Sequence, residues 1–323
     1  MNRELFERQY GSAWAAFERM LEHLEGQSSG IKTGLKLDGF PELYREICHH
    51  LALARARRYG VELEERLNRL ALRGHQQLYL APSPITRSGL AEFFASTFPR
   101  ALRRELRLFW LAAGLLYLPA LLSLVLVHAQ PELAYSFLGP EEAASFEHMY
   151  SPEGQKERAS KLDVYMFGYY IYNNISVSFR TFASGLICGL GAIFFLVYNG
   201  LMFGAAAGHV GNFGHSEAFF SFVVAHGAFE LTAIVISGLA GLRLGLALLS
   251  PGQRSRARAL YEEARVALPL IYGVIAMLLV AAFLEAFWSS NSGLPTPLRL
   301  GAGALCWGLV IAYFSLAGRS RGS

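Results

Sequence analysis

Residues 108–127 read LFWLAAGLLYLPALLSLVLV, twenty positions without a charged side chain. A helix of about 20 apolar residues is long enough to cross the roughly 30 Å hydrocarbon core of a bilayer. Four basic residues directly precede this stretch: Arg100, Arg103, Arg104 and Arg107. Because basic residues beside a span favour the cytoplasmic side, the stretch predicts a first transmembrane helix that runs outward from the cytoplasm.

The rest of the composition divides the chain into two parts with different solvents. The whole chain is 53% hydrophobic and only 17% charged, with a formal net charge of +4, whereas average soluble domains carry about 25% charged residues. Charged side chains are dense before residue 107 and sparse after it. We therefore expect a cytoplasmic helical domain over residues 1–106 and a transmembrane domain over residues 107–323, with an external loop at 129–169.

Further apolar stretches follow the external loop. They cover residues 174–212, 218–249, 268–288 and 298–317. The segment 250–265 is rich in arginine and is expected in the cytoplasm. The chain must therefore cross an odd number of times between residues 169 and 250. Three crossings give about six spans in total, which we favour; one crossing plus a re-entrant segment, or broken middle helices, is the alternative. Both termini then lie in the cytoplasm.

The first hundred residues show apolar side chains at helical spacing. Helices are expected over residues 1–26, 41–58 and 61–80, and a fourth from residue 88 towards the membrane. Charged residues near the start interrupt any apolar core, so no signal peptide is predicted. The fold class is therefore all-α, a polytopic membrane helix bundle plus a small cytoplasmic helical domain.

Small residues recur at intervals of four in the transmembrane part. They are Gly185 and Gly189, then Gly200, Gly204 and Gly208, then Gly241 and Gly245. Glycine lets helix backbones approach closely in lipid, so these positions predict tight helix packing. A pore or substrate path lined by glycine is the alternative.

Polar side chains inside apolar segments are the candidate site residues. They are Asn173, Asn174, Arg180, Asn199, His226 and Glu230. Ionisable groups inside a bilayer are costly and usually have partners, so we expect one buried polar network that holds helices together. Proton or ion handling is an alternative, because histidine titrates near neutral pH.

Metal binding is considered for the same residues. His226 and Glu230 supply only two ligands, and His209 and His215 would have to fold back to complete a site. Glu285 lies beside aromatic residues near the external end of its segment and is interpreted as an interfacial anchor. No metal, cofactor or catalytic residue is therefore assigned.

Familiar enzyme motifs are absent from the sequence. There is no phosphate-binding loop, no Gly-x-Ser-x-Gly and no His-Glu-x-x-His. The three cysteines fit neither a disulfide framework nor a paired zinc site. The protein is more readily explained as a non-enzyme. The excess of arginine beside apolar segments indicates anionic lipid rather than nucleic acid as a partner.

Several short motifs resemble those of the stage II sporulation protein M family. They are Leu43-Tyr-Arg45, Leu51-Ala-Leu-Ala-Arg55, Leu67-Asn68 and Leu78-Tyr79 in the first part, then Asn173-Asn174, Gly185-Leu-Ile-Cys-Gly189, Asn199-Gly200 and His226-Gly-x-x-Glu230. The resemblance covers residues 14–249 and implies an integral membrane protein. The sporulation member works in a membrane complex with cell-wall-degrading partners. Relatives with a longer N-terminal domain, as here, occur in non-sporulating bacteria, often encoded near AAA ATPases and von Willebrand-type proteins.

Three functions follow as hypotheses. The first is a scaffold or assembly protein of the bacterial inner membrane that forms homo-oligomers and docks partner proteins, such as other envelope or ATPase-complex proteins, through its cytoplasmic helices. The second is a transporter or channel that uses Arg180, His226 and Glu230, because broken middle helices mark substrate sites in transporters. The third is an intramembrane hydrolase acting on lipid or wall precursors.

Overall fold

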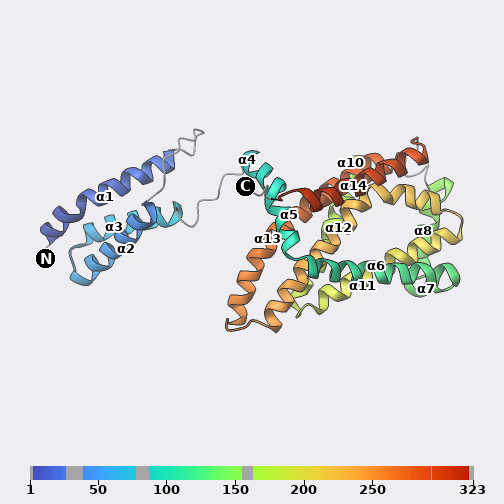
Figure 1. The fold of residues 1–323 in the computed structure, drawn as a ribbon, viewed down its shortest axis with the longest axis horizontal. Helices are drawn as coiled ribbons and strands as arrows, with labels where there is room; N and C mark the ends of the chain where they lie inside the picture. Colours follow the sequence, from blue (N-terminus) through green and yellow to red (C-terminus); the bar gives the residue numbers. More distant parts are fainter. Residues whose placement is uncertain (1–2, 27–38, 78–86, 155–162, 292, 320–323) are drawn as a thin grey trace. The chain divides into compact units, whose positions relative to one another are not determined.

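The computed structural model describes residues 3–26, 39–77, 87–154, 163–291 and 293–319. In these ranges all regular structure is helical, which confirms the predicted all-α fold class (Figure 1). The chain divides into two compact units, Met1–Arg87 and Ser88–Ser323. Each is described separately below, the first as the N-terminal unit and the second as the membrane unit.

The N-terminal unit consists of α1 (Arg3–Gly26), α2 (Phe40–Arg57) and α3 (Val61–His75). The bounds of α1 and α2 agree closely with the helices expected from periodicity. Helix α3 ends at His75, and residues 78–80 of the third expected helix lie outside the described residues. One face of each helix supplies a common apolar core. Its largest fully buried members include Phe6, Trp14, Phe17, Ile47 and Leu67. The unit therefore has a hydrophobic core of its own.

His50 of α2 is a buried histidine in that core. The Nε1–H group of Trp14 donates a hydrogen bond to Nδ1 of His50 at 3.2 Å. This bond requires an unprotonated Nδ1. Burial lowers the pKa of His50, and the nearby His49 lowers it further, although Glu46 opposes the shift.

The N-terminal unit is expected to lose stability in mild acid. Because the pKa of His50 is lower in the folded than in the unfolded chain, its contribution is complete above about pH 6.5 and is lost as the pH falls through the folded value. Thermal unfolding of residues 1–87, followed by circular dichroism from pH 8 to pH 5, measures this. His50→Gln is expected to flatten the profile; an equal slope in both proteins would refute the role of His50.

The membrane unit begins with short helices and continues as a bundle of long ones. In chain order its elements are α4 (Arg87–Glu92), η2 (Phe93–Thr97), α5 (Phe98–Arg104), α6 (Leu106–Ala129), α7 (Leu133–Phe137), α8 (Pro140–Tyr150), α10 (Asp163–Ala183), η3 (Ser184–Leu186), α11 (Leu190–Asn212), α12 (Ser216–Leu249), α13 (Arg256–Phe283), η4 (Leu284–Ser289) and α14 (Thr296–Leu316). Helix α12 is central, and α6, α10, α11, α13 and α14 all pack against it.

Five helices are long and apolar enough to cross a membrane: α6, α11, α12, α13 with η4, and α14. Helix α10 is less apolar but packs in the same bundle against α12 and α13. Its 21 residues span roughly 31 Å at 1.5 Å per residue. The bundle therefore contains six long helices in its described part.

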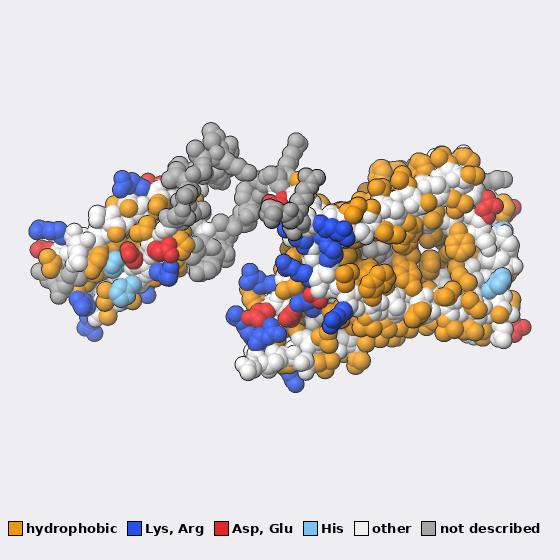
Figure 2. Space-filling view, viewed as in Figure 1, with side chains coloured by type: hydrophobic (Ala, Val, Ile, Leu, Met, Phe, Trp, Pro, Cys, Tyr) orange, Lys and Arg blue, Asp and Glu red, His pale blue; other side chains and the backbone are white. Residues whose placement is uncertain are grey.

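The outer surface of the bundle is apolar. Large side chains such as Trp110, Leu118 and Leu305 are each about two-thirds exposed. Figure 2 shows hydrophobic side chains covering the middle of the membrane unit, whereas Lys and Arg side chains gather at the end that carries α5 and the α12–α13 turn. A continuous apolar surface of this extent is unfavourable in water but suits lipid. The membrane unit is a transmembrane domain.

The two compact units divide between Arg87 and Ser88, whereas the boundary expected between residues 106 and 107 separates cytoplasm from membrane and stays a prediction. The short helices from Arg87 to Arg104 belong to the membrane unit, because they pack into its core. Phe98 is fully buried there, and the hydroxyl of Tyr313 on α14 donates to the carbonyl of Phe94 at 2.7 Å. The arginines of α5 are thereby held at one end of the bundle.

The middle helices are continuous in the described residues. Helix α10 ends in the single 3-10 turn η3, and α11 starts at Leu190 after a turn that needs positive φ at Cys188 and Gly189. Helix α12 runs unbroken through 34 residues. Between residues 163 and 249 the chain thus passes through the bundle three times, as the expected six spans require.

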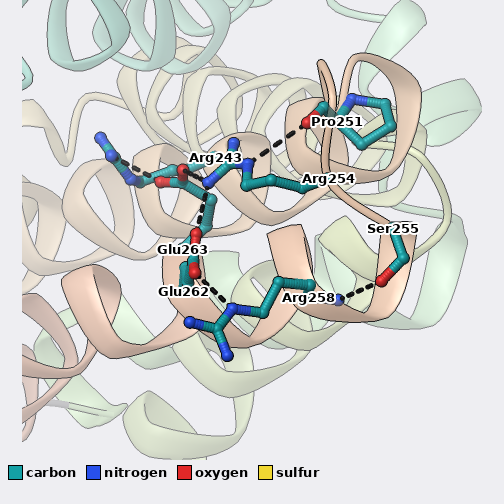
Figure 3. Close-up of polar contacts among 7 residues, drawn as sticks. All are labelled: Arg243, Pro251, Arg254, Ser255, Arg258, Glu262 and Glu263. Atoms are coloured by element: carbon teal, nitrogen blue, oxygen red, sulfur yellow. Dashed lines mark hydrogen bonds and ion pairs between the residues drawn. The ribbon is translucent and has the colours of Figure 1, made fainter.

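Partly buried ion pairs hold the turn between α12 and α13 to the start of α6. Arg243 of α12 pairs with Glu105, which precedes α6, and with Glu263 of α13 at 2.6 Å. Each of these three side chains is about one-fifth exposed. More exposed pairs surround them, including Arg254 with Glu262 at 2.8 Å (Figure 3). We call Glu105, Arg243 and Glu263 the charge triad.

Candidate functional site

Helix α12 carries two ionisable side chains in the interior of the membrane unit. His226 and Glu230 are one turn apart, so they share a face of the helix. His226 is 4% exposed, and Glu230 is partly buried. This face is directed at a cavity between the helices, which both residues line.

A third ionisable side chain reaches the same place from the other side. Glu285 lies on η4, a π-helical turn that continues α13. The ligating atoms of His226, Glu230 and Glu285 all lie within 4.8 Å of one another. Ser289, also on η4, places its Oγ 3.1 Å from Nδ1 of His226. Single π-helical turns are rare and recur at functional sites, because the extra residue redirects the side chains. We call His226, Glu230 and Glu285 the His–Glu–Glu cluster.

The cavity has a volume of about 270 Å³. Its lining comes from α6, α8, α10, α11, α12 and η4, and its polar lining residues are Glu142, Tyr150, Asn173, Asn199, His226, Glu230 and Glu285. Glu142 belongs to α8 and is exposed. The cavity therefore reaches the surface at the α8 end of the bundle, away from the arginines.

Apart from His226, the charged side chains that line the cavity are all acidic in the described residues. Three carboxylates line it, and the lining contains no Lys or Arg among the residues that the structure describes. Asn174 is a neutral donor beside the cavity: its Nδ2 approaches Oε2 of Glu285 at 3.5 Å, and its Oδ1 accepts from Nδ2 of Asn173 at 3.2 Å. Carboxylates close together in a weakly polar site cannot all stay ionised without compensation. An arrangement of this kind can hold bound protons or a cation.

The structure brings most of the sequence candidates together. Asn173, Asn199, His226 and Glu230 line the cavity, and Asn174 is buried beside it. Arg180 does not line it: it lies two turns further along α10 and is exposed.

The two other histidines considered above as metal ligands, His209 and His215, lie outside the His–Glu–Glu cluster. His209 is buried in ring contacts with Tyr135 and Phe213, and His215 precedes α12. Sequence reasoning missed the role of Glu285, because the direction of a side chain on a π-helical turn cannot be read from helical periodicity.

The recurring glycines lie at helix contacts that form the walls of this region. Gly185 and Gly189 pack against Gly241 and Gly245, so the turn between α10 and α11 sits directly on α12. Gly200, Gly204 and Gly208 bring α11 against the backbone of α6 at Leu116, Ala120 and Leu124. Helices α6 and α11 lie side by side along much of their length (Figure 1).

Comparison with known families decides the relationship of the chain. A family model described as stage II sporulation protein M matches residues 108–290, more than half of the chain. The chain belongs to the stage II sporulation protein M family. The matched range contains the whole His–Glu–Glu cluster and Glu142. In this member of the family, a second model, described as a domain of unknown function (DUF8413), matches residues 4–80. No curated protein and no solved structure matches.

Proposed function

We propose that this family member is a scaffold or assembly protein of the bacterial inner membrane, whose N-terminal unit docks a soluble partner. The observation that carries the proposal is the two-unit architecture. A compact three-helix unit with its own core is joined to a transmembrane bundle. A helical unit with its own core leaves its outer surface available to bind a partner protein. The membrane bundle would then anchor that partner at the membrane.

The distribution of charge supports a cytoplasmic position for both termini. Arginines of α5 and of the α12–α13 turn gather at one end of the bundle, whereas the α7–α8 segment at the other end carries Glu132, Glu141 and Glu142. By the positive-inside rule the arginine-bearing end faces the cytoplasm. The cavity then opens to the outside of the inner membrane.

The outward face of α14 supports self-association. Gly301, Ala304 and Gly308 are exposed on it, and a Cβ added at either glycine would meet nothing within 4 Å. Small residues at this spacing allow a second helix to approach closely in lipid. Copies of the membrane unit are proposed to associate through this face.

The mass of the protein in lipid nanodiscs or mild detergent tests the scaffold proposal. The wild type is expected to form a defined homo-oligomer, and Gly308→Leu to shift it towards the monomer. Gly168→Leu on α10 is the matched control, because that exposed glycine also has open space around it. A wild type that is strictly monomeric at all concentrations would count decisively against the proposal.

A second candidate function is the passage of a small cation across the membrane. The specific observation in its favour is the carboxylate-lined cavity that reaches the surface at Glu142. Flux of monovalent and divalent cations into proteoliposomes, measured for the wild type and Glu230→Gln, tests it. Flux that is lost in the variant supports a transporter or channel; absent flux, or flux that Glu230→Gln leaves unchanged, eliminates this function.

A further inference from the structure

We propose that His226, Glu230 and Glu285 bind one divalent transition-metal ion at the base of the cavity. The three side chains offer one imidazole nitrogen and two carboxylate oxygens, all within 4.8 Å of one another. Ligands bonded to one ion at about 2.0–2.2 Å lie roughly 3.0–3.5 Å apart. A closure of at most about 1.3–1.8 Å therefore completes the coordination, and side-chain rotations can supply it.

The charge of the surroundings favours a cation of charge +2. Glu230 and Glu285 together carry two negative charges when ionised, and the cavity lining includes no Lys or Arg among the described residues. A divalent ion neutralises both carboxylates at once, which removes the cost of holding them together in a weakly polar interior.

The ligands are also supported from behind, as metal ligands usually are. Ser289 contacts Nδ1 of His226 at 3.1 Å, which orients the ring and leaves Nε2 as the nitrogen that can bind the ion. Asn174 approaches Glu285 at 3.5 Å. Contacts of this kind orient the ligands and tune their basicity. Because His226 and Glu230 come from α12 and Glu285 from η4, the bound ion would link two helices.

The donor set and the space select the kind of ion. A ligating imidazole suits Zn²⁺, Mn²⁺ or Co²⁺, whereas Mg²⁺ and Ca²⁺ prefer oxygen ligands alone. The cavity of about 270 Å³ leaves room for several water molecules, each of about 30 Å³. Three protein ligands with water in the remaining positions is the arrangement of an open metal site. Glu142 at the mouth would attract cations towards it.

This inference concerns binding alone and holds whether the protein is a scaffold or a transporter. Its experiment uses the full chain in nanodiscs, stripped with chelator and titrated with Mn²⁺, Co²⁺ or Zn²⁺ in equilibrium dialysis. One ion per chain is expected. Glu230→Gln and Glu285→Gln are each expected to weaken binding by about tenfold or more.

Two matched controls distinguish this site from general binding to carboxylates and histidines. Glu142→Gln removes a carboxylate of the same cavity and is expected to change affinity much less. His209→Gln removes a buried histidine outside the cluster and is expected to leave it unchanged. Substoichiometric binding, or binding that neither Glu230→Gln nor Glu285→Gln weakens, would overturn the proposal and leave protonated carboxyls as the occupants of the site.

X-ray absorption of the wild type loaded with one equivalent of Zn²⁺ provides a test that depends on no variant. A first shell of nitrogen and oxygen atoms with the outer-shell scattering of one imidazole ring is expected. Absence of imidazole scattering, or a first shell that includes sulfur, would contradict the assignment even if the variants failed to fold.

Discussion

The Arg243→Met variant is expected to unfold at a clearly lower temperature than the wild type. Arg243 is the only cation of the charge triad, where it pairs with Glu105 and Glu263. Methionine fills similar space but removes the cation that Glu105 and Glu263 share, each less than one-fifth exposed, and leaves Glu263 only its longer pair with Arg254 at 3.4 Å. Removing one partner of a buried ion pair costs about 3–5 kcal/mol, and the partial exposure here favours the lower end of that range.

Thermal unfolding in detergent, followed by tryptophan fluorescence or by loss of the monodisperse fraction, measures this effect. Arg254→Met is the matched control, because it removes an arginine of the same turn. Arg254 is 40% exposed, and its ion pairs with Glu262 and Glu263 are accessible to water. Exposed pairs contribute little. Equal destabilisation by the two substitutions would show that the charge triad has no special role.

The Gly204→Leu and Gly245→Leu variants are expected to lose most of their folded yield. A Cβ at Gly204 would overlap the carbonyl of Ala120 on α6, and one at Gly245 would overlap the backbone of Gly189. Backbone atoms cannot rotate away as a side chain can, so the helices must separate. Overpacking of a well-packed interior typically costs about 1–3 kcal/mol, and a clash with backbone belongs at the upper end.

Folded yield is measured as the monodisperse fraction after extraction, with Gly308→Leu on α14 as the control. Gly308 has open space around an added Cβ, so this variant should fold as the wild type does even where it fails to self-associate. Normal folding of both Gly204→Leu and Gly245→Leu would contradict the close helix contacts described above.

Much of the fold could be predicted from hydropathy and periodicity, because lipid imposes simple demands on a helix. The uninterrupted run at 108–127 became α6. The parity of arginine-rich segments required an odd number of passes between residues 169 and 250, of which three was the favoured number. Apolar content alone does not identify α10, because its tyrosines and asparagines lower its hydropathy. The end of the N-terminal unit could not be predicted from the sequence either. Whether the helices from Arg87 to Arg104 pack on the bundle depends on tertiary contacts such as those of Phe98.

The candidate site could be predicted only in part, for a physical reason. His226 and Glu230 are recognisable because two ionisable residues one turn apart are conspicuous in an apolar helix. Glu285 is equally polar but seemed to belong to the aromatic end of its segment. The π-helical turn changes which residues face inward, and Glu285 thereby joins the cluster. Arg180 shares a helical stripe with Asn173, yet it lies beyond the cavity.

Cysteine labelling tests most directly whether this bundle spans the membrane with its cavity open to the outside. In a chain whose native cysteines are replaced by serine, Ser145→Cys lies on the exposed surface of α8, and Gln253→Cys lies in the α12–α13 turn. With a membrane-impermeant maleimide applied to spheroplasts, Ser145→Cys should react at once and Gln253→Cys only after lysis. Protection of Ser145→Cys until lysis, or reaction of Gln253→Cys in intact spheroplasts, would contradict this arrangement.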